Sequence, residues 1–459
     1  MSHTLFILFW ATGDLAKRYL LPSLANICKN GSEMDIIAVG RRPFTSEDFR
    51  NFIREEGWWF FSDGIEIESF LSKVIYSQVE IDEAKDYHAL AETIKSKSKN
   101  TTQIVIYLSI ATEHFPFFLE HIAPYKVSLP PIRVVFEKPF GSDLASARTL
   151  QKQIEAVFPE RDVYRIDHYV AKNGIENLLA FRFWNTVFDP VWNHKFIDNI
   201  QITASESLGI GDRGGFYEKA WALRDMVQNH LFQTLAMVIM RKPKSLKPHD
   251  LQEAKTEALG SLLLSNRLEE AVVFGQYEWY RNEKNVDIHS QTETFVALEV
   301  ASKFPEWAGV PFYIRTGKKL DIKVTQIVIE FKLPENIGFS SLEQNRIVIE
   351  IQPDESIEIT FAKKSQSDDY ALEPMISSSR VASTGKWAYE KLLEDVIIWD
   401  PTLFTTWEML ELTWKAIDPI IHCKEACPIV HIYPPWSRWP KAMYELLENS
   451  GRKWYEWAL

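Results

Sequence analysis

The chain has 459 residues, of which 46% are hydrophobic and 25% charged, close to the averages for globular proteins. These values exclude intrinsic disorder, coiled coils and collagen, and the length suits one or two large domains. The net charge of −12 argues against a nucleic-acid-binding surface and allows one local basic pocket for an anionic metabolite. Because Cys28, Cys423 and Cys427 are too few for a disulfide scaffold, we expect a reducing cytoplasmic location.

We expect neither a membrane span nor a signal peptide in the N-terminal sequence. Its longest apolar run, residues 5–11, is far shorter than the ~20 residues that a spanning helix needs. The run lacks the basic flank of a signal peptide. We therefore expect no membrane partner, and the run is typical of a fully buried β-strand.

Strand-like and helix-like patterns alternate along the first part of the chain. The predicted strands are 5–9, 35–39, 103–110 and 132–137, and the predicted helices are 15–29, 46–56 and 144–157. Strands that alternate with helices predict a parallel sheet with crossover connections. We expect an α/β, Rossmann-like dinucleotide-binding domain over residues 1–170.

The pattern of apolar and polar residues changes after about residue 175. Segments in which apolar and polar residues alternate appear there, and they are typical of half-buried antiparallel strands. The predicted strands are 197–205, 268–277, 292–300, 327–333, 346–352 and 356–362. A long helix is predicted over 218–240 and a polar loop over 377–383. We expect a second, α+β domain over residues 171–459 with a large, mainly antiparallel sheet.

The first predicted strand runs into a turn, W-A-T-G-D-L-A-K at residues 10–17. Dinucleotide pyrophosphates bind at such a turn, against the N-terminus of the following helix. Only Gly13 supports the G-x-G-x-x-G pattern, so a plain strand–helix connection is an equal alternative. Arg41 ends the second strand, where a cation suits a ribose 2′-phosphate and favours NADP over NAD. The alternative is that Arg41 and Arg42 are merely solvated.

Three further clusters carry polar chemistry. Lys138 follows a buried strand, where ligands of α/β sheets bind, and Lys138–Pro139 is a candidate cis bond. Residues 165–172, R-I-D-H-Y-V-A-K, suit a phosphate ester or form a solvated loop. Asp225 and His230 lie five residues apart on the predicted helix, about 140° around its axis. A histidine beside an apolar stripe is also typical of a core group.

Together these motifs resemble the glucose-6-phosphate dehydrogenase family over nearly the whole chain. The resemblance rests on T-G-D-L-A-K, E-K-P-F-G, R-I-D-H-Y, R-G-G-x-Y, R-D-M-x-Q-N-H and V-P-F-Y-I-R-T-G-K, in that order. It implies oxidation of β-D-glucose 6-phosphate to 6-phosphoglucono-1,5-lactone with hydride transfer to NADP, with NAD as the alternative. This reaction is the first step of the pentose phosphate pathway.

The resemblance also implies roles for individual residues. His230 is expected to be the general base and Asp167 its partner, a task that suits a histidine at neutral pH. The expected substrate-binding residues are Lys138, His168, Tyr169, Lys172, Glu206, Asp225, Lys318, Lys323 and Gln352. The expected cofactor-binding residues are Trp10, Thr12, Gly13, Asp14, Leu15, Arg41 and Lys138.

The remaining expectations concern the assembly and metals. The site is expected in the cleft between the domains, and relatives are homodimers or homotetramers built on the large sheet. His422 with Cys423 and Cys427 falls short of four ligands at zinc spacing, so no metal is expected.

Several tryptophans stand where the family has glycine: Trp10, Trp184, Trp221, Trp399, Trp436 and Trp439. A glycine position lacks room for an indole. One explanation is a gene in which UGA encodes glycine, translated with a code that reads UGA as tryptophan. The other is a genuine divergent relative with a damaged cofactor site. A non-catalytic sugar-phosphate-binding protein and a dehydrogenase of another hexose phosphate are the alternative functions.

Overall fold

The computed structural model describes residues 3–167, 169, 173–335, 344–366, 371–380, 388–426 and 429–456. The chain divides into two compact units. The first unit comprises Met1–Ala171, Lys247–His249 and Gly385–Trp407, and the second comprises Lys172–Leu246, Asp250–Thr384 and Glu408–Leu459. The sequence had assigned everything after residue 170 to the second domain, whereas the segment before Trp407 returns to the first unit.

The first unit is built on a parallel sheet that has six strands among the described residues, in the order β3-β2-β1-β4-β5-β6. The strands are β1 (Thr4–Phe9), β2 (Met34–Gly40), β3 (Val74–Gln78), β4 (Gln103–Leu108), β5 (Ile132–Phe136) and β6 (Val163–Arg165). This order is that of a doubly wound dinucleotide-binding fold, which confirms the expected Rossmann-like architecture. Every residue of the inner strand β1 is buried, as its uninterrupted apolar sequence predicts.

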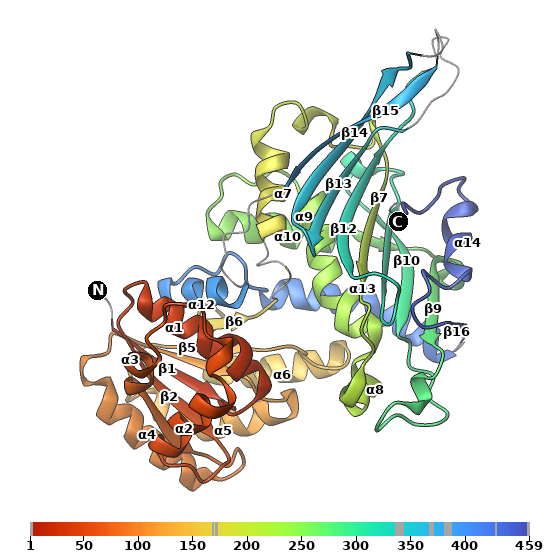
Figure 1. Cartoon of the computed structure of the whole chain (residues 1–459). Coiled ribbons are helices and arrows are strands. Elements are labelled where there is room, and N and C mark those ends of the chain that lie inside the picture. The colour runs from red at the N-terminus through yellow and green to blue at the C-terminus, as the bar shows by residue number, and fades with distance from the viewer. Residues whose placement is uncertain are drawn as a thin grey trace. The chain divides into compact units, whose positions relative to one another are not determined.

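Helices surround this sheet (Figure 1): α1 (Leu21–Lys29), α2 (Ser46–Glu56), α3 (Ile67–Ser72), α4 (Ala84–Lys97), α5 (Phe115–Lys126) and α6 (Leu144–Val157). Capping fixes where they begin. The Thr45 hydroxyl accepts the backbone N–H of Asp48, and the Asp48 carboxylate accepts the N–H of Thr45, at the start of α2. This reciprocal arrangement satisfies two backbone groups that a helix start otherwise leaves unpaired.

Helix α12 (Ala388–Ile398) explains why a distant segment belongs to the first unit. Its residues Leu392, Leu393 and Val396 are fully buried in the core that β1 and α1 share. The buried Arg133 guanidinium on β5 donates to the Val396 carbonyl at 2.6 Å. The helix therefore closes one face of the sheet, although more than 200 residues separate it from that sheet in the chain.

The second unit contains a mixed sheet that has ten strands among the described residues. In spatial order they are β15 (Leu372–Arg380), β14 (Ser356–Lys364), β13 (Arg346–Gln352), β12 (Val324–Phe331), β7 (Ile197–Ser205), β11 (Phe312–Gly317), β10 (Phe295–Ser302), β9 (Val272–Tyr277) and β16 (His431–Tyr433), while β8 (Leu262–Leu264) pairs with β10. The β7–β11 and β9–β16 pairs are parallel and the other pairs are antiparallel. The expected large, mainly antiparallel sheet is confirmed.

Two local predictions for this unit were wrong. The predicted loop 377–383 overlaps β15, which pairs with β14 from Leu372 to Arg380 and projects with it at one end of the sheet (Figure 1). Most of this edge strand is exposed, so polar residues are compatible with it. The predicted strand 268–277 begins as the short helix α11 (Leu268–Ala271).

The predicted helix 218–240 is interrupted. It consists of α8 (Gly214–Ala222), a π-helical segment Leu223–Leu231, and α9 (Phe232–Ile239). The backbone kinks at Trp221, where φ is 52° and ψ is 166°. A π-helix bonds each N–H to the carbonyl five residues earlier, so Asp225 and His230 are neighbours along the axis. The separation of about 140° expected for an α-helix is therefore wrong.

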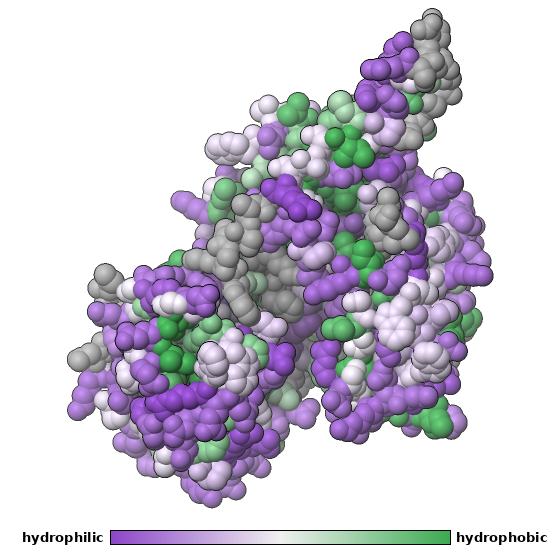
Figure 2. Space-filling view, in the orientation of Figure 1, coloured by the Kyte–Doolittle hydropathy of each residue, from purple (hydrophilic) through white to green (hydrophobic). Residues whose placement is uncertain are grey.

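The other helices of this unit are α7 (Asn173–Trp184), α10 (Pro248–Gly260), α13 (Trp407–Ala426) and α14 (Ala442–Glu448). Within the described ranges, every helix is too short or too polar to cross a membrane. The face of the molecule seen in Figure 2 is mostly hydrophilic, with apolar side chains in small scattered groups.

Candidate active site

Two predicted site residues meet because their strands are parallel neighbours. Glu206 directly follows β7 and Lys318 directly follows β11, and Ser205 pairs with Gly317 in the register of the two strands. The Lys318 ammonium nitrogen lies 2.6 Å from Glu206 Oε2. The Lys318 side chain is only 5% exposed, so its charge depends on this partner.

Asp225 brings a second carboxylate to the same ammonium group. Its Oδ2 lies 3.9 Å from Lys318 Nζ, and it reaches this point from the π-helical segment. We call Glu206, Asp225 and Lys318 the acid–lysine cluster. Two carboxylates accept hydrogen bonds and an ammonium donates them, a combination that matches hydroxyl groups, which do both.

His230 lies on the same π-helical segment and is 1% exposed. Its backbone carbonyl accepts the Thr234 hydroxyl at 2.8 Å. Because of the π-helical register, His230 follows Asp225 along one side of the helix axis.

The phosphate motif belongs to the first unit. Asp167 is 3% exposed, and its Oδ1 accepts the backbone N–H of Tyr169 at 2.9 Å. Tyr169 is itself buried. His168 and Lys172 lie outside the described residues. Asp167 belongs to the first unit and His230 to the second.

Lys323 and Gln352 lie at the sheet edge that carries Glu206 and Lys318. Gln352 ends β13, and its amide nitrogen donates to the Thr325 hydroxyl at 2.6 Å. Val324, next to the exposed Lys323, pairs with Ser205 at the end of β7. The strand register therefore gathers the ends of β7, β11 and β13 and the start of β12.

The predicted cofactor turn connects β1 to a helix that begins at Ala16 and continues into α1. The Gly13 N–H donates to the Trp10 carbonyl at 2.8 Å, and the Lys17 N–H donates to the Gly13 carbonyl at 3.1 Å. Thr12 and Leu15 are half-buried, while Asp14 is exposed and pairs with Arg18 at 2.8 Å.

Trp10 occupies this turn in a backbone conformation that suits glycine. Its φ is 58°, in the left-handed region that bulky residues avoid. Its indole stacks on the His114 ring with centroids 5.7 Å apart. The Arg41 guanidinium, predicted to bind a 2′-phosphate, lies 4.9 Å from the centre of the indole. The indole therefore contacts the Arg41 guanidinium, which was expected to bind the cofactor.

Lys138 lies beside a buried acid that sequence reasoning missed. The Glu137 carboxylate accepts hydrogen bonds from the hydroxyls of Tyr107 and Tyr389. Burial raises the pKa of Glu137, against the opposing effects of these hydrogen bonds and of Lys138. The E-K-P-F-G motif contained this residue, but its buried partners are 30 residues away or further. The Lys138–Pro139 bond is cis.

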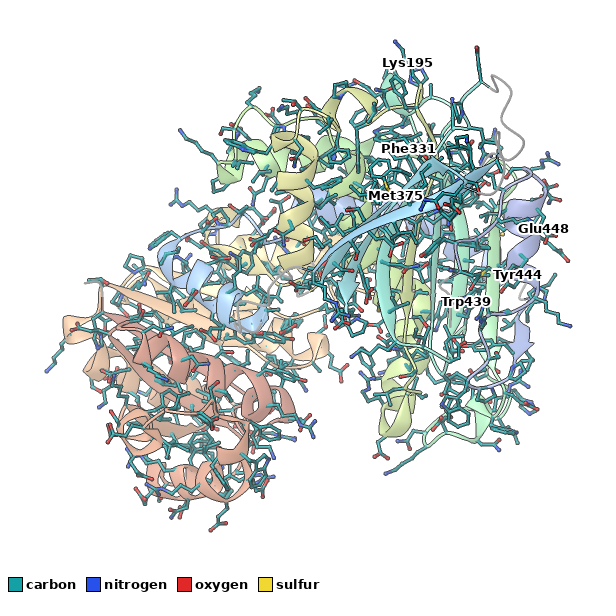
Figure 3. All side chains as sticks on the ribbon, turned by 45° about the horizontal axis from the view of Figure 1, so that its top comes forward. Lys195, Phe331, Met375, Trp439, Tyr444 and Glu448 are labelled. Atoms are coloured by element: carbon teal, nitrogen blue, oxygen red, sulfur yellow. The ribbon has the colours of Figure 1, made fainter. Side chains whose placement is uncertain are left out.

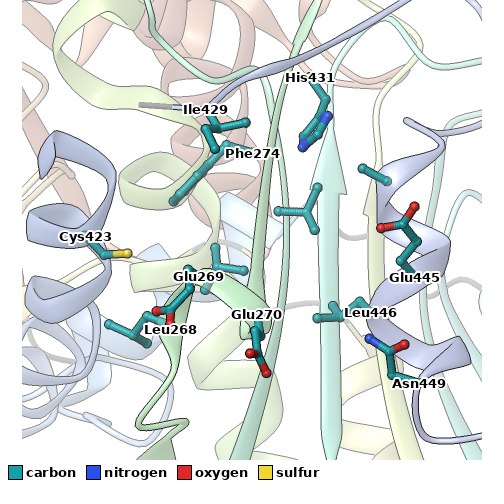
Figure 4. Close-up of a pocket in the computed structure, with 13 residues that line it drawn as sticks. Leu268, Glu269, Glu270, Phe274, Cys423, Ile429, His431, Glu445, Leu446 and Asn449 are labelled. Carbon is teal, nitrogen blue, oxygen red and sulfur yellow. The ribbon is translucent and has the colours of Figure 1, made fainter. Parts of the chain in front are cut away.

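Two hollows in the surface of the second unit lie away from these residues. One, of about 320 Å³, lies between β9, β16 and α14, and Figure 4 shows Glu269, Glu445 and His431 around it with the half-buried thiol of Cys423. Cys427 lies outside the described residues.

A second hollow, of about 680 Å³, is mainly apolar and lies over β12 to β14. Lys195 and Phe331, which line it, are labelled in Figure 3 near Met375 on β15. It contains none of the predicted site residues.

Two family models match the chain in consecutive segments. Residues 7–177 match "Glucose-6-phosphate dehydrogenase, NAD binding domain", and residues 179–455 match "Glucose-6-phosphate dehydrogenase, C-terminal domain". The chain is 36% identical to the glucose-6-phosphate 1-dehydrogenase of Bacillus subtilis, over 98% of this chain and 97% of that protein. It is also 36% identical to that of Chlamydia muridarum, over 98% and 96%.

The chain is also similar to two solved structures of glucose-6-phosphate dehydrogenases. A glucose-6-phosphate dehydrogenase in complex with glucose 6-phosphate superposes with a TM-score of 0.90, at 28% identity over 99% of both chains. The Mycobacterium avium glucose-6-phosphate 1-dehydrogenase superposes with a TM-score of 0.88, at 30% identity and the same coverage.

Proposed function

The chain belongs to the glucose-6-phosphate dehydrogenase family, and we propose that it oxidises β-D-glucose 6-phosphate to 6-phosphoglucono-1,5-lactone. The observation that carries this proposal is the acid–lysine cluster at the sheet edge, which supplies hydroxyl-binding groups 112 residues apart in sequence. The structural similarity to a relative in complex with glucose 6-phosphate supports glucose 6-phosphate as the substrate.

His230 acts as the general base. It takes the proton of the anomeric hydroxyl, and Asp167 is proposed as its partner, which would orient the imidazole and stabilise the imidazolium. Burial of the His230 ring supports this role, because a buried base is shielded from competing water. Asp225 lies on the same π-helical segment as His230, and it binds a sugar hydroxyl beside the base.

The phosphate of the substrate is bound by His168, Tyr169 and Lys172. Charge-assisted hydrogen bonds to a phosphate are among the stronger polar contacts. Glu206, Asp225 and Lys318 bind sugar hydroxyls, and Lys323 and Gln352 complete the edge. Lys138 serves substrate and cofactor together.

The backbone of the first turn fits a dinucleotide and the Trp10 indole does not. The end of β1, Gly13 and the following helix start form the usual pyrophosphate cradle, and Arg41 ends the neighbouring strand. The indole, however, stacks against Arg41. Thr12, Gly13, Asp14, Leu15 and Arg41 are the residues that would hold NADP, which would supply the acceptor for the hydride of the anomeric carbon.

The assembly is a homodimer or homotetramer. Large apolar side chains are exposed around the sheet of the second unit, among them Phe196, Leu333, Phe361, Met375 and Ile376, and such groups favour burial in an interface. A cytoplasmic location is supported by the free thiol of Cys28, since reducing compartments keep thiols unpaired. Analytical ultracentrifugation measures the assembly directly.

The test of the function is NADPH formation with glucose 6-phosphate, compared with the 6-phosphates of mannose, galactose and fructose. Preferred turnover of glucose 6-phosphate is expected. The Trp10 indole favours a second candidate, a sugar-phosphate-binding protein without cofactor. Binding of glucose 6-phosphate by calorimetry, with neither NADP binding nor turnover, would establish that alternative.

A further inference from the structure

Tyr217 lies beside the acid–lysine cluster and was not among the predicted site residues. It projects from α8 and is 2% exposed. The Lys318 ammonium lies 5.3 Å from the centre of its ring, and Tyr280 packs against the ring edge-on, with centroids 6.3 Å apart. Its side chain is therefore fixed by packing next to groups that bind the substrate.

The Tyr217 hydroxyl lacks a hydrogen-bond partner among the residues that the structure describes. Buried polar groups are almost always bonded. Three buried tyrosines of the same core follow that rule: Tyr277 donates to Glu283 at 3.0 Å, Tyr280 to Glu218 at 2.6 Å and Tyr433 to the Lys318 carbonyl at 2.7 Å. We therefore expect a group of a bound ligand to be the hydrogen-bond partner of this hydroxyl beside the cluster.

The surroundings also fix the direction of that hydrogen bond. Burial holds the pKa of Tyr217 well above its ordinary value, and the negative charges of Asp225, Glu293 and Glu206 act in the same direction. The hydroxyl therefore keeps its proton and donates it. A sugar hydroxyl that donates to a carboxylate of the cluster still has lone pairs that accept from tyrosine.

We propose that Tyr217 is a substrate-binding residue that donates a hydrogen bond to a ring hydroxyl of the hexose 6-phosphate. This inference rests on the proposed function, because the ligand is the sugar that the acid–lysine cluster binds. It adds a specificity contact from α8 to those from the sheet edge.

Tyr217→Phe removes only the hydroxyl and breaks no described protein hydrogen bond. The dissociation constant for glucose 6-phosphate, measured by calorimetry, is expected to rise by about three- to tenfold, the range of one hydrogen bond. Its unfolding midpoint in urea is expected to equal or exceed that of the parent chain. The matched control Tyr280→Phe loses the bond to Glu218, so its midpoint falls and its affinity stays unchanged.

Deoxy sugars identify the hydroxyl concerned. The parent chain is expected to bind one of the 2-, 3- and 4-deoxy analogues of glucose 6-phosphate more weakly, and Tyr217→Phe is expected to lose that preference. Equal affinities of parent and variant for glucose 6-phosphate and all three analogues would overturn the inference. Calorimetry requires no turnover, so an inactive parent that binds the sugar would contradict the proposed function and leave this measurement valid.

A different observation concerns the backbone of the tryptophans. Of the seven non-glycine residues with positive φ in the described ranges, five are tryptophan: Trp10 (58°), Trp221 (52°), Trp279 (70°), Trp399 (67°) and Trp436 (57°). Tryptophan makes up only 16 of the 459 residues. A bulky residue in this region is a genuine outlier, whereas glycine adopts it freely.

At three of the five positions, burial does not account for this strain. Trp279, Trp399 and Trp436 are each more than half exposed, and strained residues persist only where their surroundings hold them. Two other tryptophans behave differently: the indoles of Trp192 and Trp307 are buried, and they donate to the carbonyls of Val238 and Ile239. Neither has a positive φ.

We infer that the five positive-φ positions carry glycine in the living protein, encoded by UGA in an organism that reads UGA as glycine. Trp279 joins this set through its backbone alone. Trp184 and Trp439 have no positive φ, so this criterion does not include them. Trp192 and Trp307 are expected to be encoded by UGG.

The codons and the natural protein test this inference together. UGA at positions 10, 221, 279, 399 and 436, UGG at 192 and 307, and glycine in tryptic peptides of the protein from its own organism are expected. UGG or tryptophan at the five positions would overturn it. For the recombinant chain, Trp279→Gly is expected to raise the melting temperature and the control Trp192→Gly to lower it.

Discussion

The Lys318 ammonium lies 2.6 Å from the Glu206 carboxylate, although 112 residues separate the two in the chain. The contact exists because β7 and β11 are parallel neighbours that end at the same edge. Removing the lysine takes away the ammonium group that Glu206 and Asp225 share. The consequences of that charge balance can be measured.

Lys318→Met is expected to weaken glucose 6-phosphate binding at least tenfold and to lower the free energy of unfolding by about 1–3 kcal/mol, because a largely buried charge loses its partner. The matched control is Lys319→Met, whose ammonium pairs with Glu283 at 2.9 Å. That variant loses an ion pair as well but should keep its affinity. Calorimetry and urea unfolding of both variants check the difference, and equal losses of affinity would refute the role of Lys318.

His230→Asn is expected to lower kcat by roughly 10²–10⁴ or more, the usual contribution of a general base, while glucose 6-phosphate binding stays within about twofold. The amide fills the buried position without accepting the proton. Steady-state kinetics and calorimetry on the same preparation separate the two effects. Near-normal turnover would rule out His230 as the base.

Glu137→Gln is expected to change how stability depends on pH. Burial raises the folded-state pKa of Glu137 above 4.5, so its contribution to stability is present below that value and is lost as pH rises through the folded pKa. The variant lacks this loss, so its stability relative to the parent should increase as the pH rises above about 4.5. The increase is about 1.4 kcal/mol for each unit by which the pKa is raised.

Urea unfolding across this range measures the Glu137 effect. Glu47→Gln on α2 is the control, because hydrogen bonds from Arg54 and Arg50 lower the pKa of this exposed carboxylate. Its difference from the parent should stay constant above about pH 5, since the group is ionised there in both folded and unfolded chains. A constant difference for Glu137→Gln as well would contradict the prediction.

Trp10→Gly is expected to tighten NADP binding at least tenfold, because it frees the turn backbone and releases Arg41 from the indole. Glucose 6-phosphate binding should not change, since the substrate residues lie elsewhere in the chain. Titration of NADP against both proteins measures the gain. Trp399→Gly, which changes an exposed positive-φ residue outside the turn, is the control and should leave NADP affinity unaltered. Tight binding by the parent without a gain would show that Trp10 does not obstruct the cofactor.

The sequence alone determined the architecture of the first unit and the family. Uninterrupted apolar runs such as β1 have to be buried on both faces, and in a chain where strands alternate with helices a parallel sheet covered by helices does that. The resemblance to the family, carried by motifs in the same order along the chain, implied Glu206, Asp225 and Lys318 as substrate-binding residues. These inferences rest on local patterns, which a single segment carries by itself.

Tertiary structure decided the rest, because it depends on contacts between distant segments. The return of α12 to the first unit follows from burial of Leu392 and Val396 against a sheet far back in the chain. No local periodicity in the sequence predicts the π-helical register that aligns Asp225 with His230. The unbonded Tyr217 hydroxyl emerges only when every neighbour is in place, since satisfaction of a buried polar group is a property of the whole surrounding shell and not of the residue.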